Sequence, residues 1–269
     1  MRSRLFILAG LTTMVAFAGC ASKWAGRLTL PDRYTVVRQQ VMMHSDFPLP
    51  ENHRLLESLC TQRADLAQRL GLPACDEPIH VYLFENAERF KGFIRLHHPE
   101  FPDRRAFFVE TDTRLCVYAQ WGDRLGEDLR HEVTHGYLHS VVQNLPLWLD
   151  EGLAKYGEAP RGRHGLNRAY LDMLLSRLQQ GAWQPDLRRL EQIAPPRDMN
   201  QQEYAESWAW VHFLLESGPE NLGLLRAYLA ELRREGSAEP LSRRLERALG
   251  QPQRAWIEHV RSLAAAPSS

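Results

Sequence analysis

The feature that most constrains this chain is a thirty-residue stretch, 129–158, with histidines and glutamates in a distinctive spacing. It contains His131-Glu132-x-x-His135, and Glu151 follows after fifteen intervening residues. Residues four apart on a helix project from one face, so both imidazoles can reach a single metal ion. Two imidazoles and one carboxylate form a known ligand set for catalytic zinc, with a fourth position left for water. The spacing therefore predicts a Zn²⁺ site on a helix.

The residues around the two histidines support this helix. Glu132 directly follows the first histidine, where its carboxylate can lie beside the water and accept its proton. With helical steps of about 100°, the face opposite the histidines is apolar or small: Leu129, Val133, Gly136, Tyr137 and Ser140. We expect that face to pack on a core while the histidines point away from it.

Glu151 lies in a second predicted helix. Pro146 suits the first turn of this helix, and Asn144 is a candidate cap. Gly152 costs helix stability, which a close approach of the two helices around the metal would explain. The three ligands are therefore expected to come from two neighbouring helices.

The run HEVTH followed by WLDEGLAKY resembles the gluzincin zinc peptidases, in which a second helix carries a glutamate in a W-L-x-E-G-x-A pattern. The short gap and the run LPLWLDEGLA are more similar to the peptidase MA-like bacterial lipoproteins, a family of uncharacterised function. The specific motif covers only the stretch 129–158. The resemblance implies that His131, His135 and Glu151 bind zinc, that Glu132 is the general base, and that the substrate is a peptide or protein.

Neighbouring residues are weaker ligand candidates. His139 lies about 12 Å along the helix axis from His131, too far to share one ion, so we expect it behind the ligands or at the surface. Asp150 points about 100° away from Glu151 on the same helix. A metzincin site would need glycine at position 138 and histidine at 141, where this chain has leucine and valine.

The groups that orient the two imidazoles are left open by the sequence. The thermolysin-like branch of the gluzincins places an acid one turn after the ligand glutamate, where this chain has Lys155. Asp128, Asp150 and Glu158 are the candidates for this role.

A third helix is a candidate source of a further catalytic group. Asn200-x-x-Glu203 predicts a capping-box start, with Tyr204 in the first turn. Amide hydrolysis builds negative charge on the carbonyl oxygen, which a tyrosine or histidine donor stabilises. A tyrosine downstream of the glutamate does this in the aminopeptidase branch, and Tyr204 matches it by order. A core tyrosine is the alternative, and His164 and His212 are further candidates.

The remaining elements indicate an α+β fold. Strands are predicted at 34–44, 79–84, 105–110 and 114–120, the last two as a hairpin. Helices are predicted at 52–70, 87–96, 168–180, 200–217, 220–234, 240–249 and 252–264. This predicts a gluzincin-like zinc-binding half with a small mixed sheet at 34–160 and a helical half at 161–264. By the same resemblance, Leu115–Gln120 is expected to be an edge strand that binds an extended substrate, with an ordinary central strand as the alternative.

Residues 1–19 predict a bacterial lipoprotein signal peptide. A basic start and an apolar run lead to Ala18-Gly19-Cys20, which resembles a lipobox. The mature chain would begin at Cys20 with lipid attached, followed by a tether at 20–33. No aspartate follows the cysteine, which favours the outer membrane, facing the periplasm. An ordinary signal peptide or a short transmembrane anchor is the alternative, and no other run is apolar enough to span a bilayer.

Composition limits the possible partners. The 33 basic and 33 acidic residues cancel, so nothing indicates a nucleic-acid partner. Cys60, Cys75 and Cys116 are an odd number, and Cys60 and Cys75 could form a disulfide or all three stay free thiols. Residues 265–269 predict a disordered tail. These patterns leave the oligomeric state open.

The sequence thus predicts a lipid-anchored zinc metallopeptidase of the bacterial envelope. One alternative is a non-catalytic lipoprotein that serves as a binding or assembly module. A closed structural zinc site would need a fourth protein ligand, for which only His139 and Asp150 are near. The other alternative is a zinc amidase that acts on peptidoglycan.

Overall fold

The computed structural model describes residues 29–181, 183–195 and 198–265. The predicted signal peptide, Cys20, most of the tether and nearly all of the predicted tail lie outside the described residues. No helix in the described ranges has both the length and the apolar character needed to cross a membrane. Cys60, Cys75 and Cys116 are free thiols, so the disulfide alternative is not realised.

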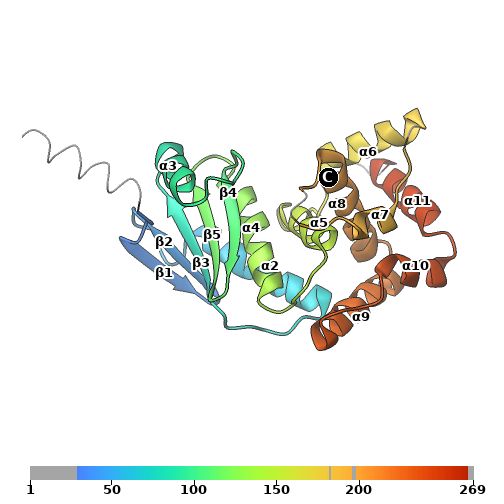
Figure 1. Ribbon diagram of the computed structural model, residues 1–269, viewed down its shortest axis with the longest axis horizontal. Coiled ribbons are helices and arrows are strands. Elements are labelled where there is room, and N and C mark those ends of the chain that lie inside the picture. The colour runs from blue at the N-terminus through green and yellow to red at the C-terminus, as the bar shows by residue number, and fades with distance from the viewer. Residues whose placement is uncertain (1–28, 182, 196–197, 266–269) are drawn as a thin grey trace, which may run out of the picture.

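A five-stranded mixed sheet forms the N-terminal half (Figure 1). Its strands are β1 (Tyr34–Arg38), β2 (Val41–Ser45), β3 (Ile79–Phe84), β4 (Ala106–Thr111) and β5 (Arg114–Gln120). Their spatial order is β1-β2-β3-β5-β4. The central strands β2, β3 and β5 run parallel, whereas β1 and β4 pair antiparallel at the two edges. The expected α+β class is confirmed.

Two expectations about strands are wrong. The single strand at 34–44 is two antiparallel strands, because the chain reverses after Arg38, where Gln39 has a φ of +52°. The expected edge strand, Leu115–Gln120, is internal, since β5 pairs with β3 on one side and with β4 on the other. The hairpin itself is confirmed, so the edge strand of the hairpin is the first one, β4.

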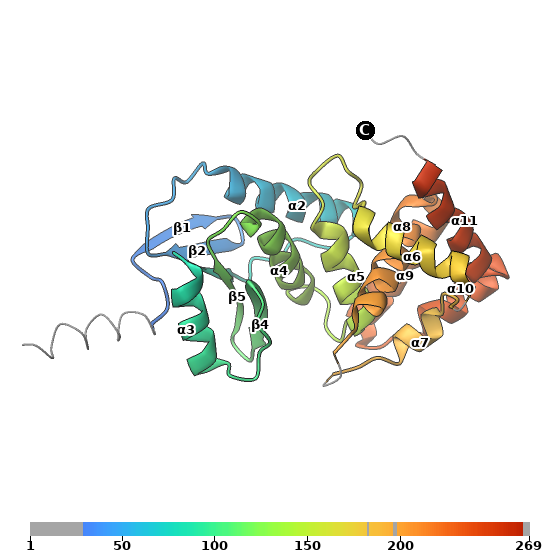
Figure 2. The same ribbon diagram turned by 90° about the horizontal axis from the view of Figure 1, so that it is seen from above.

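Helices cover both faces of the sheet (Figures 1 and 2). They are α2 (Arg54–Leu70), α3 (Ala87–His97) and α4 (Leu125–His139). Alternate residues of β5 separate the two layers: Val117 and Ala119 join the core beneath α2 and α4, whereas Cys116 and Tyr118 join the aromatic cluster beneath α3. The period-two alternation of a strand produces this division.

The C-terminal half is helical. It contains α5 (Leu147–Gly157), α6 (Arg168–Gln180), α7 (Leu187–Glu191), α8 (Gln201–Glu216), α9 (Pro219–Glu235), α10 (Leu241–Leu249) and α11 (Pro252–Ala265). The five helices expected after residue 167 are all present, and only the short α7 was not expected. Helix α8 is central and contacts α5, α6, α7, α9 and α11. One apolar cluster runs from the sheet through α4 and α5 to α11, so the division at residue 160 stays a prediction.

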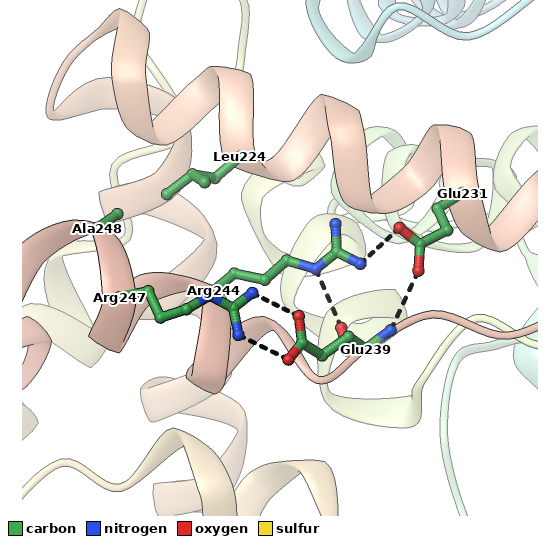
Figure 3. Close-up of a pocket in the computed structure, with 6 residues that line it drawn as sticks. All are labelled: Leu224, Glu231, Glu239, Arg244, Arg247 and Ala248. Atoms are coloured by element: carbon green, nitrogen blue, oxygen red, sulfur yellow. Dashed lines mark hydrogen bonds and ion pairs between the residues drawn. The ribbon is translucent and has the colours of Figure 1, made fainter.

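Ion pairs join α9 to α10 beside a cavity of ≈ 460 Å³ (Figure 3). Arg244 Nη2 lies 2.7 Å from Glu231 Oε2, and Arg247 Nη1 donates to Glu239 Oε1 at 2.7 Å. Arg244 Nε also donates to the main-chain oxygen of Glu239. The charged side chains that line this cavity therefore neutralise one another, and they connect α10 to α9 and to the segment between the two helices.

Candidate metal centre

Helix α4 presents its histidines because its opposite face is fixed by packing. A Cβ added to Gly136 would lie 2.9 Å from Ile79 Cδ1, so the missing side chain of Gly136 lets α4 pack closely on β3 with Ile79 in its present position. Tyr137 donates a hydrogen bond from its hydroxyl to the main-chain oxygen of Leu59 at 2.9 Å. Leu129 and Val133 are fully buried on the same face. The apolar face expected from the helical wheel is confirmed.

Helix α5 is held between α4 and α8 by two glycines. A Cβ on Gly152 would lie 2.7 Å from the main-chain oxygen of Ser207, so the close approach is to α8 and not, as expected, between the two metal-bearing helices. Gly157 provides the approach to α4, with Thr134 Oγ1 at 2.7 Å from its would-be Cβ. The expected Asn144 cap is wrong, because that side chain donates to the main-chain oxygen of Gly236 and no side chain caps α5.

Three candidate ligand atoms converge between these helices. His131 Nε2 and His135 Nε2 are 3.2 Å apart. Glu151 Oε2 lies 3.6 Å from the former and 3.9 Å from the latter. Tetrahedral zinc with ligand bonds of about 2.0–2.1 Å separates its ligand atoms by roughly 3.3–3.4 Å. The three side chains therefore form a group that could hold a metal ion.

The hydrogen bonds of the imidazoles also favour a cation at this point. His135 Nδ1 lies 2.9 Å from Asp150 Oδ1, and because an ionised carboxylate only accepts, Nδ1 carries the proton. His131 Nδ1 lies 2.9 Å from Glu158 Oε1 without forming a hydrogen bond, so this ion-pair contact does not assign the tautomer of His131. With a metal ion bound, both Nε2 atoms would face it with a lone pair. Glu151 Oε2 is buried and has no hydrogen-bond partner among the described residues, so a cation fits this donor set.

The carboxylates around the site make it strongly attractive to positive charge. Burial favours the neutral form of His135, but Asp150, Glu151 and Glu132 outweigh burial and raise its pKa to about 10. Burial likewise disfavours the charged form of Asp150, yet His135 and His139 hold the pKa of this carboxyl well below its usual range. The same negative potential attracts a divalent metal ion.

Each of the two candidate ligand histidines is supported by a chain of polar contacts. Asp150 bridges His135 to His139, whose Nε2 lies 3.0 Å from Asp150 Oδ2, and His139 Nδ1 lies 2.7 Å from Glu110 Oε2. On the other side, Glu158 connects His131 to Lys155, whose Nζ lies 2.7 Å from Glu158 Oε1. Such contacts fix the ring orientation of metal-binding histidines.

Of the candidate orienting groups, Asp150 and Glu158 contact the ligands and Asp128 does not. Asp128 forms a two-pronged pair with Arg105 instead, at 2.7 and 2.8 Å. His135, His139 and Asp150 also lie close enough together to form a second possible ligand group. We interpret them as a hydrogen-bond chain because their contacts of 2.9 and 3.0 Å are ordinary hydrogen-bond lengths.

Glu132 and Tyr204 lie close to this group. Glu132 is partly exposed on α4, and its charge contributes to the raised pKa of His135. Tyr204 stands in the first turn of α8, after the expected capping box, which is present. Its hydroxyl accepts a hydrogen bond from Arg104 at 3.4 Å, and burial and then Glu151 raise its pKa. The catalytic roles of both residues stay predictions.

The two alternative histidines lie elsewhere. His212 Nδ1 and His259 Nε2 are 2.9 Å apart in the helical half, and His164 is nearest to Glu216 at 3.8 Å. Sequence reasoning missed Arg104 and Tyr170; burial is the largest influence on the pKa of each residue, and the charge of Glu151 is a smaller one. Neither residue belongs to a recognisable sequence motif, and only tertiary packing brings them near the site.

No protein-family model matches this chain, and a search of curated proteins finds no match. The fold and the site together define an α+β protein with a buried His-His-Glu group that could hold a metal ion.

Proposed function

We propose that this protein is a zinc metallopeptidase of the gluzincin type. The observation that carries the proposal is the convergence of His131 Nε2, His135 Nε2 and Glu151 Oε2 within 3.9 Å of one another, with Glu132 on the same helix. When bound there, zinc would supply a water of lowered pKa and would polarise a substrate carbonyl.

The residues of the chain would carry the remaining steps. Glu132 would take a proton from water and deliver it to the leaving amine. Tyr204 would donate its hydroxyl proton to the carbonyl oxygen as negative charge develops, since Arg104 already occupies the acceptor side of that hydroxyl. Edge strand β4 packs against α4, and Phe108 on β4 stacks over His135. An extended peptide could therefore add to β4 by main-chain hydrogen bonds.

The geometry favours a catalytic over a structural zinc site. A closed structural site needs four protein ligands. Of the two fourth-ligand candidates, Asp150 contacts Nδ1 of His135, on the side of the ring away from Nε2, and His139 contacts Asp150. A structural site also has no need for Glu132. The non-catalytic binding module and the peptidoglycan amidase are therefore the second and third candidates, and the amidase would share this chemistry.

The surroundings of the enzyme are proposed from the sequence alone. We infer lipidation at Cys20, attachment to the outer membrane facing the periplasm, and a peptide or protein substrate. The N-terminal motif that supports the anchor lies outside the described residues.

Two measurements test the function. The mature chain should contain about one zinc by elemental analysis and should cleave members of a peptide library in a chelator-sensitive way. Glu132→Gln should keep zinc and abolish hydrolysis, whereas Glu151→Ala should lose zinc. Full activity in Glu132→Gln would refute the role of the base, and an unchanged zinc content in Glu151→Ala would refute the ligand set.

A further inference from the structure

A cavity of ≈ 880 Å³ lies between α2, the end of α5, the connection from α5 to α6, and α9. Figure 2 shows that connection beside α2. Arg130 of α4 also contributes to the wall, but none of His131, His135 and Glu151 does. This cavity is therefore separate from the candidate metal centre. We name it the arginine groove.

The charge of the arginine groove is unbalanced. Five arginines line it against two carboxylates: Arg54, Arg69, Arg130, Arg161 and Arg226 against Glu57 and Asp65. Arg161 pairs with Asp65 at 3.0 Å, and Arg69 pairs with Glu216 at 2.7 Å. Arg226 donates to the main-chain oxygens at the end of α2. Among the described residues, Arg54, Arg130 and Arg226 have no carboxylate within ion-pair distance. Since Arg226 is held by two main-chain oxygens, Arg54 and Arg130 are the two cations best able to meet an incoming anion.

Arg130 is the better anchored of the two. Its Nε donates to the main-chain oxygen of Glu158 at 2.8 Å, which fixes the guanidinium and leaves its other N–H groups without a carboxylate partner. The side chain is half-buried. A partly desolvated cation gains more from an incoming anion than a solvated surface arginine does.

The shape of the arginine groove indicates an extended ligand. Its lining residues on α2 run from Arg54 to Arg69, a rise of about 22 Å. An extended chain of six or seven residues covers roughly that length. Leu66, Leu222 and Tyr156 add apolar surface between the charges. A recess of this kind does not suit a flat membrane surface, whereas a peptide strand can enter it.

We propose that the arginine groove binds an extended acidic peptide segment, with Arg54 and Arg130 pairing with its carboxylates and the apolar wall contacting its aliphatic side chains. This site is independent of the proposed function, because it needs neither the metal nor the residues that would hold it. Its ligand is defined by charge and length, so the binding is expected to weaken as salt rises.

The test is binding of a fluorescent heptapeptide of alternating glutamate and leucine, capped at both ends, to the mature protein with chelator present. We expect saturable binding, and a glutamine version of the peptide should bind at least tenfold more weakly. Arg130→Gln and Arg54→Gln should each weaken binding about tenfold, as expected for the loss of one charge-assisted pair. Arg95→Gln is the matched control, because Arg95 is exposed on α3 and does not line the groove.

Several outcomes would overturn the proposal. They are equal binding of the glutamate and glutamine peptides, equal losses in Arg95→Gln and Arg130→Gln, or competition by phosphatidylglycerol vesicles or inorganic phosphate at the concentrations where the peptide binds. Unfolding midpoints show whether each variant is folded. If Arg130→Gln fails to fold, the exposed Arg54 carries the test alone, and unchanged affinity in Arg54→Gln would overturn the assignment.

Discussion

Replacing Gly152 by alanine tests how the fold positions the metal ligand beside it. Two opposing effects decide the result. Alanine in a helix interior is favoured over glycine by about 1 kcal/mol. Against this, the new Cβ would lie 2.7 Å from the main-chain oxygen of Ser207 and 2.7 Å from Val211 Cγ2.

The clash should win. The Ser207 oxygen belongs to the backbone of α8, which is packed on five other helices and cannot move alone. Overpacking of this kind costs about 1–3 kcal/mol and occasionally more, so after subtracting the helix propensity of about 1 kcal/mol we expect a net loss of up to roughly 2 kcal/mol. Because α5 must shift away from α8, Glu151 should also move, and zinc affinity should fall together with stability.

Gly223→Ala is the matched control. Gly223 also lies inside a helix, α9, but a Cβ there would meet no atom within 4 Å. This variant should be more stable than the wild type by up to about 1 kcal/mol. Denaturant unfolding measures the stability of both variants, and a zinc titration measures their affinity for zinc. The reasoning is refuted if Gly152→Ala is as stable as Gly223→Ala, since the approach of α5 to α8 would then not require glycine.

Further predictions concern polar groups. Asp150→Asn should weaken zinc binding about 10- to 100-fold, because the Asp150 carboxylate accepts the hydrogen bond of His135 Nδ1. Asp128→Asn should leave zinc binding unchanged. A competitive zinc titration compares the two variants. Burial is the main cause that lowers the pKa of His212 to about 4. The stabilising contribution of the neutral ring is therefore present above about pH 6.5 and is lost towards pH 4. His212→Gln should flatten the pH dependence of the unfolding free energy in that window. Burial raises the pKa of Glu206 to about 7; its contribution is present below about pH 4.5 and is lost towards pH 7, so the wild type should lose stability relative to Glu206→Gln across that range.

Local patterns predicted the parts of this molecule that local physics determines. The four-residue spacing of His131 and His135 and the apolar face opposite them required only helical geometry, and α4 has both. Most helices after residue 167 were predicted to within two residues because caps and glycines end them, as at Gly181 and Gly236, which both have positive φ.

Most of the misses depend on contacts between distant residues. Whether β5 is internal depends on its partner β3, thirty-odd residues earlier, and the alternation of one strand does not specify its neighbours. The reversal at Gln39 has no glycine or proline to mark it. Arg104 reaches Tyr204 across 100 positions of sequence. No spacing rule connects such pairs, so the ligands were predictable and much of their surroundings was not.

The candidate site depends on the whole core and not on the N-terminal half alone. His131 and His135 are placed by the packing of α4 on the sheet, through Gly136 and Ile79. Glu151 is placed by α5, because the following residue, Gly152, packs against α8 in the helical half. The separations of 3.6 and 3.9 Å between carboxylate and imidazoles therefore depend on both halves at once. A single apolar cluster connects the two halves. We therefore expect a change in the packing of α8 to shift α5 and with it Glu151.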